Sequence, residues 1–384
     1  MFVHLLKTFN QKTAHQKAVF FHTKKYIAAG DTIIPHSSLL IPHYYYNVSI
    51  DTKLIRKTSN VNSLMVIIFY MLDIALIRLG DLAVYHIAGK SAYYEDIAQL
   101  VSYCIQYLVV VPIVLVAFRL VSGKKEGLKI TACFRKPSMP AKWVAKWIVI
   151  SFGLIYAANY INTFIFSYVQ KASGTSLKGV DFTSSGTALG GVTSVLAMSV
   201  LAPFFEELMF RGTLFRNAEK CGQLTGIIMV GLTFGLWHGS YQQILYAAVM
   251  GMCACFMVAK TGSIFPSLIL HFTMNTIGAI QSVALGSIDF DKFAADLEKG
   301  QITGTAPMII IAVALLSFGL MIVGLVLFVK ELRYHRDSFR LINFCPDVSQ
   351  GKKIVIYFTA PVTILAFAGL IFITVRTALG LGLF

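Results

Sequence analysis

Apolar segments recur along the chain from about residue 61 onward, and each is long enough to cross a lipid bilayer. Only 13% of the 384 residues are charged, about half of what a soluble globule carries. Because backbone N–H groups in lipid must bond within their own segment, these segments predict helices. We expect an all-α, polytopic transmembrane bundle of about eight to nine membrane helices. The segments lie at about 61–88, 98–121, 144–169, 188–214, 223–239, 243–259, 263–285, 306–329 and 354–379.

The N-terminal 60 residues differ from the rest, because basic residues are interleaved there with apolar runs too short to span a membrane. We expect a basic cytoplasmic tail at 1–60 and one transmembrane domain at 61–384. The net charge of +15 arises mainly in loops between apolar segments, so no nucleic-acid partner is expected. Cytoplasmic loops are enriched in Lys and Arg, which predicts a multi-pass protein of the plasma membrane with a cytoplasmic N-terminus. The basic loops hold Lys124, Lys125, Lys129, Arg135, Lys136, Lys142 and Lys146, and then Lys330, Arg333, Arg336, Arg340, Lys352 and Lys353.

Two adjacent carboxylates interrupt the apolar run of the fourth segment, in the stretch P-F-F-E-E-L-M-F-R from Pro203 to Arg211. A charged side chain at the bilayer centre costs about 2.5–3.5 kcal/mol on insertion scales. Arg211 follows Glu207 by four residues, so the two share a helix face and can pair. Glu206 has no such partner in its own helix, which makes it the leading candidate for chemistry.

Two further polar pairs follow in later segments, Phe234-x-x-x-His238 and His271-x-x-x-Asn275. Residues four apart lie on one helix face, so each pair faces one side. Glu206 and His238 each lie 16 residues from an expected turn at Gly222, or about 24 Å along a helix. We therefore expect these groups to line one cavity in the cytoplasmic half of the membrane, beside a helix break after His238.

This set of groups fits hydrolysis by an activated water. A buried carboxylate beside a histidine can take a proton from water, while a second histidine and an amide can donate to a developing oxyanion. Glu206, His238 and His271 are equally a ligand set for catalytic zinc, although their spacing is not that of soluble zinc proteases. The residues alone leave both metal-bound and metal-free water open.

The order E-E-x-x-x-R, F-x-x-x-H, H-x-x-x-N in successive membrane helices resembles the CPBP family. This family, also called Abi, comprises CAAX prenyl proteases and bacteriocin-processing or self-immunity membrane proteins. The resemblance covers about residues 143–285 and implies a glutamate-dependent intramembrane endopeptidase core. It implies Glu206 as general base, His238 as the group that holds the water, and His271 with Asn275 as oxyanion donors. Glu207, Arg211 and Phe234 would be supporting residues.

The leading interpretation is an enzyme, a CAAX-type endopeptidase acting on a membrane-embedded or lipid-modified peptide or protein. One alternative is a membrane protein that binds a peptide without cutting it, in bacteriocin self-immunity or as a scaffold. A second alternative is a proton-coupled transporter, since Glu and His at mid-depth also serve proton relays. A protease needs Glu206, His238 and His271 together, whereas a binding protein should tolerate Glu206→Gln.

Overall fold

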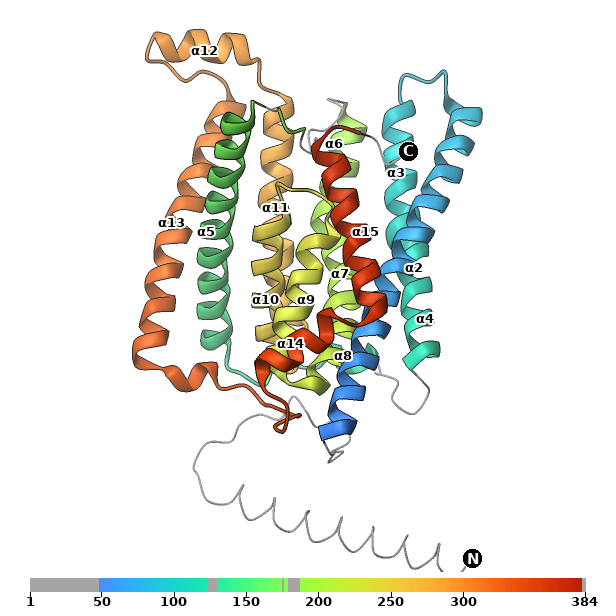
Figure 1. Cartoon of the computed structure of the whole chain (residues 1–384). Helices are drawn as coiled ribbons and strands as arrows, with labels where there is room; N and C mark the ends of the chain where they lie inside the picture. Colours follow the sequence, from blue (N-terminus) through green and yellow to red (C-terminus); the bar gives the residue numbers. More distant parts are fainter. Residues whose placement is uncertain (1–47, 123–129, 175, 179–186, 382–384) are drawn as a thin grey trace, which may run out of the picture. The chain divides into compact units, whose positions relative to one another are not determined.

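The computed structural model describes residues 48–122, 130–174, 176–178 and 187–381, and every regular element in these ranges is helical (Figure 1). The predicted tail therefore lies mostly outside the described residues, as do Lys124, Lys125 and Lys129. The α-helices are α2 (Val48–Ala88), α3 (Tyr94–Cys104), α4 (Val111–Ser122), α5 (Ala141–Ser173), α6 (Ala188–Leu196), α7 (Ala202–Met209), α8 (Arg216–Ala218), α9 (Gln223–Trp237), α10 (Ile244–Thr261), α11 (Phe265–Gly286), α12 (Phe290–Glu298), α13 (Thr305–Tyr334), α14 (Gln350–Phe358) and α15 (Pro361–Ala378).

Three π-helical segments join some of these helices: η1 (Ile105–Val110), η3 (Ala197–Leu201) and η4 (Phe210–Phe215). Short 3₁₀ turns form η2 (Ile130–Phe134), η5 (Glu219–Cys221) and η6 (Arg336–Phe339). Across these junctions the chain stays helical, so Tyr94–Ser122 and Leu189–Cys221 each form one continuous span.

Eight spans in the described ranges are long and apolar enough to cross a membrane, and α9 is a shorter apolar helix between two of them. This confirms the all-α polytopic bundle of about eight to nine membrane helices. α2 begins at Val48 instead of near 61, so it includes part of the predicted tail. The segment predicted at 354–379 is two helices, because Pro361 has no N–H to continue α14 and instead opens α15.

Glycines allow the backbones of two helix pairs to approach closely. A Cβ on Gly251 of α10 would lie 2.9 Å from the Cα of Gly231 on α9. On the other side, α5 crosses α13 where a Cβ on Gly153 would lie 2.6 Å from the Cα of Gly324. Small residues let membrane helices approach closely where lipid offers no hydrophobic driving force between them. These crossings therefore fix α9 on α10 and α13 on α5.

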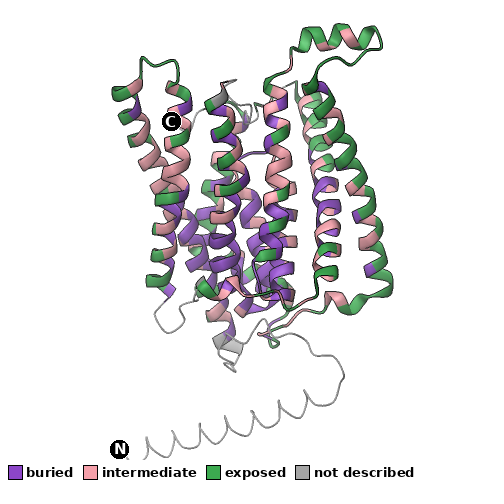
Figure 2. Cartoon of the chain, turned by 180° about the vertical axis from the view of Figure 1, so that it is seen from behind, coloured by how far each residue is buried: buried purple, intermediate pink, exposed green. Residues whose placement is uncertain are grey.

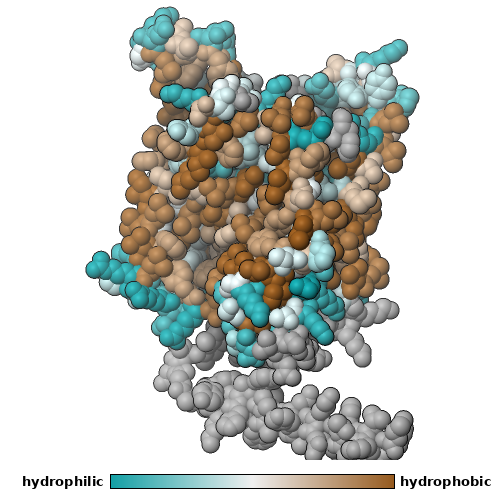
Figure 3. All heavy atoms as spheres, viewed as in Figure 1, coloured by the Kyte–Doolittle hydropathy of each residue, from teal (hydrophilic) through white to brown (hydrophobic). Residues whose placement is uncertain are grey.

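The surface of the bundle is apolar between two more polar ends. Figure 2 shows buried residues gathered in the central helices, with exposed residues along the outer ones. In Figure 3 the exposed apolar side chains form a broad band with hydrophilic residues above and below it. Such a band is what the lipid phase of a membrane requires of the helices that face it. The chain is an integral, multi-pass membrane protein.

Three small polar side chains of α2 donate hydrogen bonds to other helices. Ser59 Oγ donates to the carbonyl of Tyr357, and Ser63 Oγ donates to Thr363 Oγ1, at 2.6 and 2.8 Å. Asn62 Nδ2 donates to the carbonyl of Leu214 at 2.9 Å. All three donors are buried. These contacts bring α15 and the end of α14 against α2 and bring α2 against η4.

Candidate active site

The Glu206–Glu207 pair lies in α7, within a helix whose regularity is interrupted on both sides. Pro203 has no N–H to donate to the carbonyl four residues earlier, and the preceding turn, Ala197–Leu201, is π-helical. Both carboxylates are buried, with 5% of Glu206 and none of Glu207 exposed. Two buried carboxylates need partners, and the structure supplies different partners to each.

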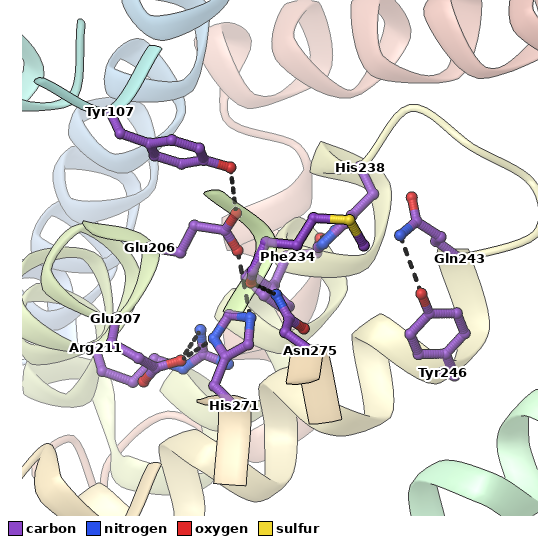
Figure 4. A network of polar contacts seen from close by, with 11 residues as sticks. Tyr107, Glu206, Glu207, Arg211, Phe234, His238, Gln243, Tyr246, His271 and Asn275 are labelled. Atoms are coloured by element: carbon purple, nitrogen blue, oxygen red, sulfur yellow. Dashed lines mark hydrogen bonds and ion pairs between the residues drawn. The ribbon is translucent and has the colours of Figure 1, made fainter. Parts of the chain in front are cut away.

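Glu207 is held by two cationic or protic groups. Its Oε1 lies 3.0 Å from Arg211 Nη1 and 2.9 Å from His271 Nδ1. The Arg211 guanidinium is fully buried and lies 4.3 Å above the centre of the Phe234 ring. The pair that the spacing predicts within one helix is therefore present, and it extends to a histidine from α11 (Figure 4).

Glu206 faces His271 and a tyrosine from η1. Tyr107 Oη donates a hydrogen bond to Glu206 Oε1 at 3.2 Å. Glu206 Oε2 lies 3.7 Å from His271 Nε2 and receives no hydrogen bond from the part of the chain that the structure describes. Glu206 Oε1 is thus hydrogen-bonded to Tyr107, while Oε2 faces the His271 imidazole.

His238 occupies the first position after α9. Its Nδ1 lies 2.7 Å from the carbonyl of Phe234, so this nitrogen carries the proton and donates it to that carbonyl. The Phe234 ring contacts both histidines edge-on, with centroids 4.7 Å from His238 and 5.8 Å from His271. Phe234 thereby contacts both histidines; the F-x-x-x-H spacing predicts its contact with His238, and the contact with His271 was not predicted.

Asn275 lies one turn after His271 on α11 and is half-buried. Its Nδ2 donates to the carbonyl of Met198 in η3 at 2.8 Å. An amide nitrogen carries two N–H groups, so this contact uses one of them. Figure 4 shows Asn275 beside His271, with His238 on the other side of the same space.

The predicted break after His238 is present, and side chains from two other helices hold it. Gly239 has a φ of +59°, a left-handed conformation that glycine adopts without strain. Tyr70 of α2 donates to the carbonyl of Trp237, and Asn162 of α5 donates to the carbonyl of Gln242 at 3.0 Å. Backbone carbonyls freed by the break are therefore satisfied inside the bundle.

Each of the three π-helical segments in the described ranges supplies one contact to this cluster. Tyr107 comes from η1, Met198 from η3 and Arg211 from η4. Single π-helical turns occur often at functional sites, because they rotate the following side chains relative to a regular helix. Sequence reasoning missed Tyr107 and Met198. A hydroxyl inside an apolar span was the one available signal for Tyr107, and nothing in the spacing linked it to Glu206.

The zinc alternative can be compared with this geometry. Within the described ranges, no three His, Cys, Asp or Glu side chains are grouped closely enough to hold a metal ion. His271 Nδ1 is bound to Glu207 and His238 Nδ1 to a carbonyl, which leaves each ring one nitrogen for any further ligand. Glu206, His238 and His271 as they stand do not form a three-ligand site.

Comparison with protein families gives a match to the central part of the chain. Residues 188–277 match the family model described as type II CAAX prenyl endopeptidase Rce1-like. The matched segment contains Glu206, His238, His271 and Asn275 and comprises 90 of the 384 residues. This confirms the resemblance that the three motifs indicate. No curated protein and no solved structure matches the chain.

Proposed function

We propose that this protein is an intramembrane endopeptidase of the CAAX prenyl protease type. Its substrate would be a membrane-associated peptide or protein, prenylated near the scissile bond. The family match over residues 188–277 supports this activity, and the clustering of the three motifs supports the site.

One observation carries the proposal. Glu206 Oε2 is buried, accepts no hydrogen bond from the described chain, and lies 3.7 Å from His271 Nε2. A single water can lie within hydrogen-bond distance of two acceptors at this separation. When neutral, His271 donates its Nδ1 proton to Glu207, so its Nε2 is an acceptor. The water's two hydrogens can therefore point at Glu206 and His271.

In the proposed reaction, the water oxygen attacks the scissile carbonyl carbon while Glu206 takes one water proton. The Asn275 amide donates to the resulting oxyanion. His271 can donate there as well when its Nε2 already carries a proton taken up from solvent, and the Glu207 carboxylate then balances its charge. Collapse of the intermediate breaks the C–N bond, and the proton held by Glu206 passes to the leaving nitrogen.

His238 is assigned a role in holding the water. Because its Nδ1 proton is donated to the Phe234 carbonyl, the neutral ring presents an accepting Nε2, which can take the second water hydrogen in place of His271 when His271 is protonated. Arg211 and Phe234 would act indirectly, since one holds Glu207 and the other packs against both histidines.

The test is cleavage of a prenylated, fluorescently labelled reporter peptide in bilayers by purified full-length protein. Glu206→Gln should lower kcat about 10²- to 10⁴-fold, because the amide cannot accept the proton. Glu219→Gln is the matched control, since it removes another buried carboxylate from the same span and should keep cleavage. Equal cleavage by wild type and Glu206→Gln would refute the assignment, and a wild type that binds but never cuts would favour the peptide-binding alternative.

A chelator arm tests the zinc prediction separately. Wild-type cleavage that persists after exhaustive chelation would support water activated by side chains alone. Cleavage that is lost with chelator and restored by added Zn²⁺ would establish a zinc enzyme. Glu206, His238 and His271 would then have to move closer together to bind the metal.

The predicted orientation, with the N-terminus in the cytoplasm, is tested by side-specific labelling. A cysteine at Asn275 should react with a membrane-impermeant maleimide added from the cytoplasmic side, above the labelling of the native cysteines. Leu316→Cys, at a lipid-facing position of α13, is the control and should react from neither side. Reaction of the Asn275 variant from the outside alone would reverse the orientation.

A further inference from the structure

A residue from outside the segment that matches the family model contacts Glu206 Oε1, the carboxylate oxygen that does not face His271. Tyr107 in η1 donates its hydroxyl to Glu206 Oε1 at 3.2 Å, whereas the matched segment begins at residue 188. We propose that Tyr107 is a positioning residue that fixes the Glu206 carboxylate, so that Oε2 alone is presented to His271 and to the attacking water. This inference rests on the proposed proteolytic function.

The tyrosine ring is itself held in place by the helix that carries the acid. Tyr107 is 6% exposed, and its ring stacks on Phe205, with centroids 6.3 Å apart and planes at 24°. Phe205 immediately precedes Glu206, so the ring and the hydroxyl both contact α7. A buried phenol needs a hydrogen-bond partner, and the Glu206 carboxylate provides it. The contact is therefore fixed at both ends of the tyrosine side chain.

Glu206 and His271 face each other, and each is oriented by a different neighbouring side chain. Glu207 orients the His271 ring through Nδ1, and Tyr107 orients Glu206 through Oε1. Without the hydroxyl, the carboxylate could rotate about its terminal bond and exchange its two oxygens, because neither would be engaged by the described chain. Hydrogen-bond partners that orient metal ligands are typically worth about 10- to 100-fold in activity, and we expect a similar factor for a partner that orients a catalytic carboxylate.

This role predicts a loss of turnover without a loss of substrate binding. Tyr107→Phe removes one oxygen and keeps the ring that stacks on Phe205. In full-length protein in bilayers, we expect kcat on the prenylated reporter to fall about 10- to 100-fold with KM unchanged, the signature of an interaction that acts in the transition state. Tyr103→Phe is the matched control, one helical turn earlier, and should keep the wild-type kcat.

A second measurement separates positioning from packing and from substrate contact. In the Glu206→Gln background, Tyr107→Phe should leave the Kd for the reporter unchanged. A weakened Kd would instead make Tyr107 a substrate-binding residue, and a markedly lowered melting temperature of Tyr107→Phe would make its hydroxyl structural. Either result overturns the inference, as does an unchanged kcat. A wild type without any cleavage would overturn the proposed function, and the inference with it.

Discussion

Helix α13 is more apolar than helix α10, yet it is much less buried. α13 is the most apolar of the eight candidate spans, yet 6% of its most apolar window is buried inside the protein, against 61% for α10. In water the reverse would hold, because apolar surface would be driven inward. In lipid, burial is decided by small residues and polar groups that need protein partners. The buried α10 accordingly crosses α9 closely at Gly251, whereas α13 exposes most of its apolar side chains.

The largest effect should come from breaking the ion pair at the centre. Arg211→Ala leaves the Glu207 carboxylate buried beside His271 with its cation removed. Removing one partner of a buried pair costs about 3–5 kcal/mol, so both the melting temperature in detergent and cleavage should fall. Arg333→Ala, at an exposed position on α13, is the control and should change stability by less than about 0.5 kcal/mol. Equal melting of the two variants would contradict the proposed importance of the pair.

A smaller loss is expected where α13 meets α5. Gly153→Leu would place a side chain against the backbone of Gly324, which a Cβ alone would approach to 2.6 Å. Overpacking of this kind costs about 1–3 kcal/mol in the free energy of unfolding, to be measured by denaturation in mixed micelles. Gly319→Leu on α13 is the matched variant, because no atom lies within 4 Å of its Cβ position. If Gly319→Leu were as damaging, the crossing would not be the feature that holds α13.

The smallest effect should be on the lipid-facing surface. Leu315 on α13 is 69% exposed, so truncation to alanine exchanges lipid contacts and little else. We expect Leu315→Ala to change the free energy of unfolding by less than about 0.5 kcal/mol and to leave kcat unchanged. Leu270 on α11 has no exposed surface, and its truncation should cost about 2–5 kcal/mol. Similar losses at the two leucines would show that α13 is covered by protein in the native state.

Much of the fold was readable from the sequence, because spanning segments are long and their ends are polar. The turn at Gly222 and the break after His238 were predictable from glycines, which here adopt φ values of +119° and +59° at 222 and 239. The start of α2 was placed too late, since the polar residues between Val48 and the apolar run do not end the helix. The break at Pro361 was missed because apolar residues continue on both sides of it.

The cluster was predictable only where helical spacing or equal depth linked its members. Glu207 with Arg211 followed from a four-residue spacing, whereas the equal depth of Glu206 and His238 stays a prediction from their distances to one turn. The contact of Tyr107 with Glu206 spans 99 positions and crosses between π-helical and α-helical segments. No periodicity encodes such a contact, because π-helical turns rotate side chains away from the positions that a regular helix gives them.

The hydrogen bonds between α2 and the last helices also constrain the order of assembly. A ribosome delivers the chain from its N-terminus, so Ser59 and Ser63 enter the membrane long before Tyr357 and Thr363 are made. Until then, the two hydroxyls lack these partners. These hydrogen bonds can therefore form only after α14 and α15 have been made, and α2 must hold its place in the bilayer until then.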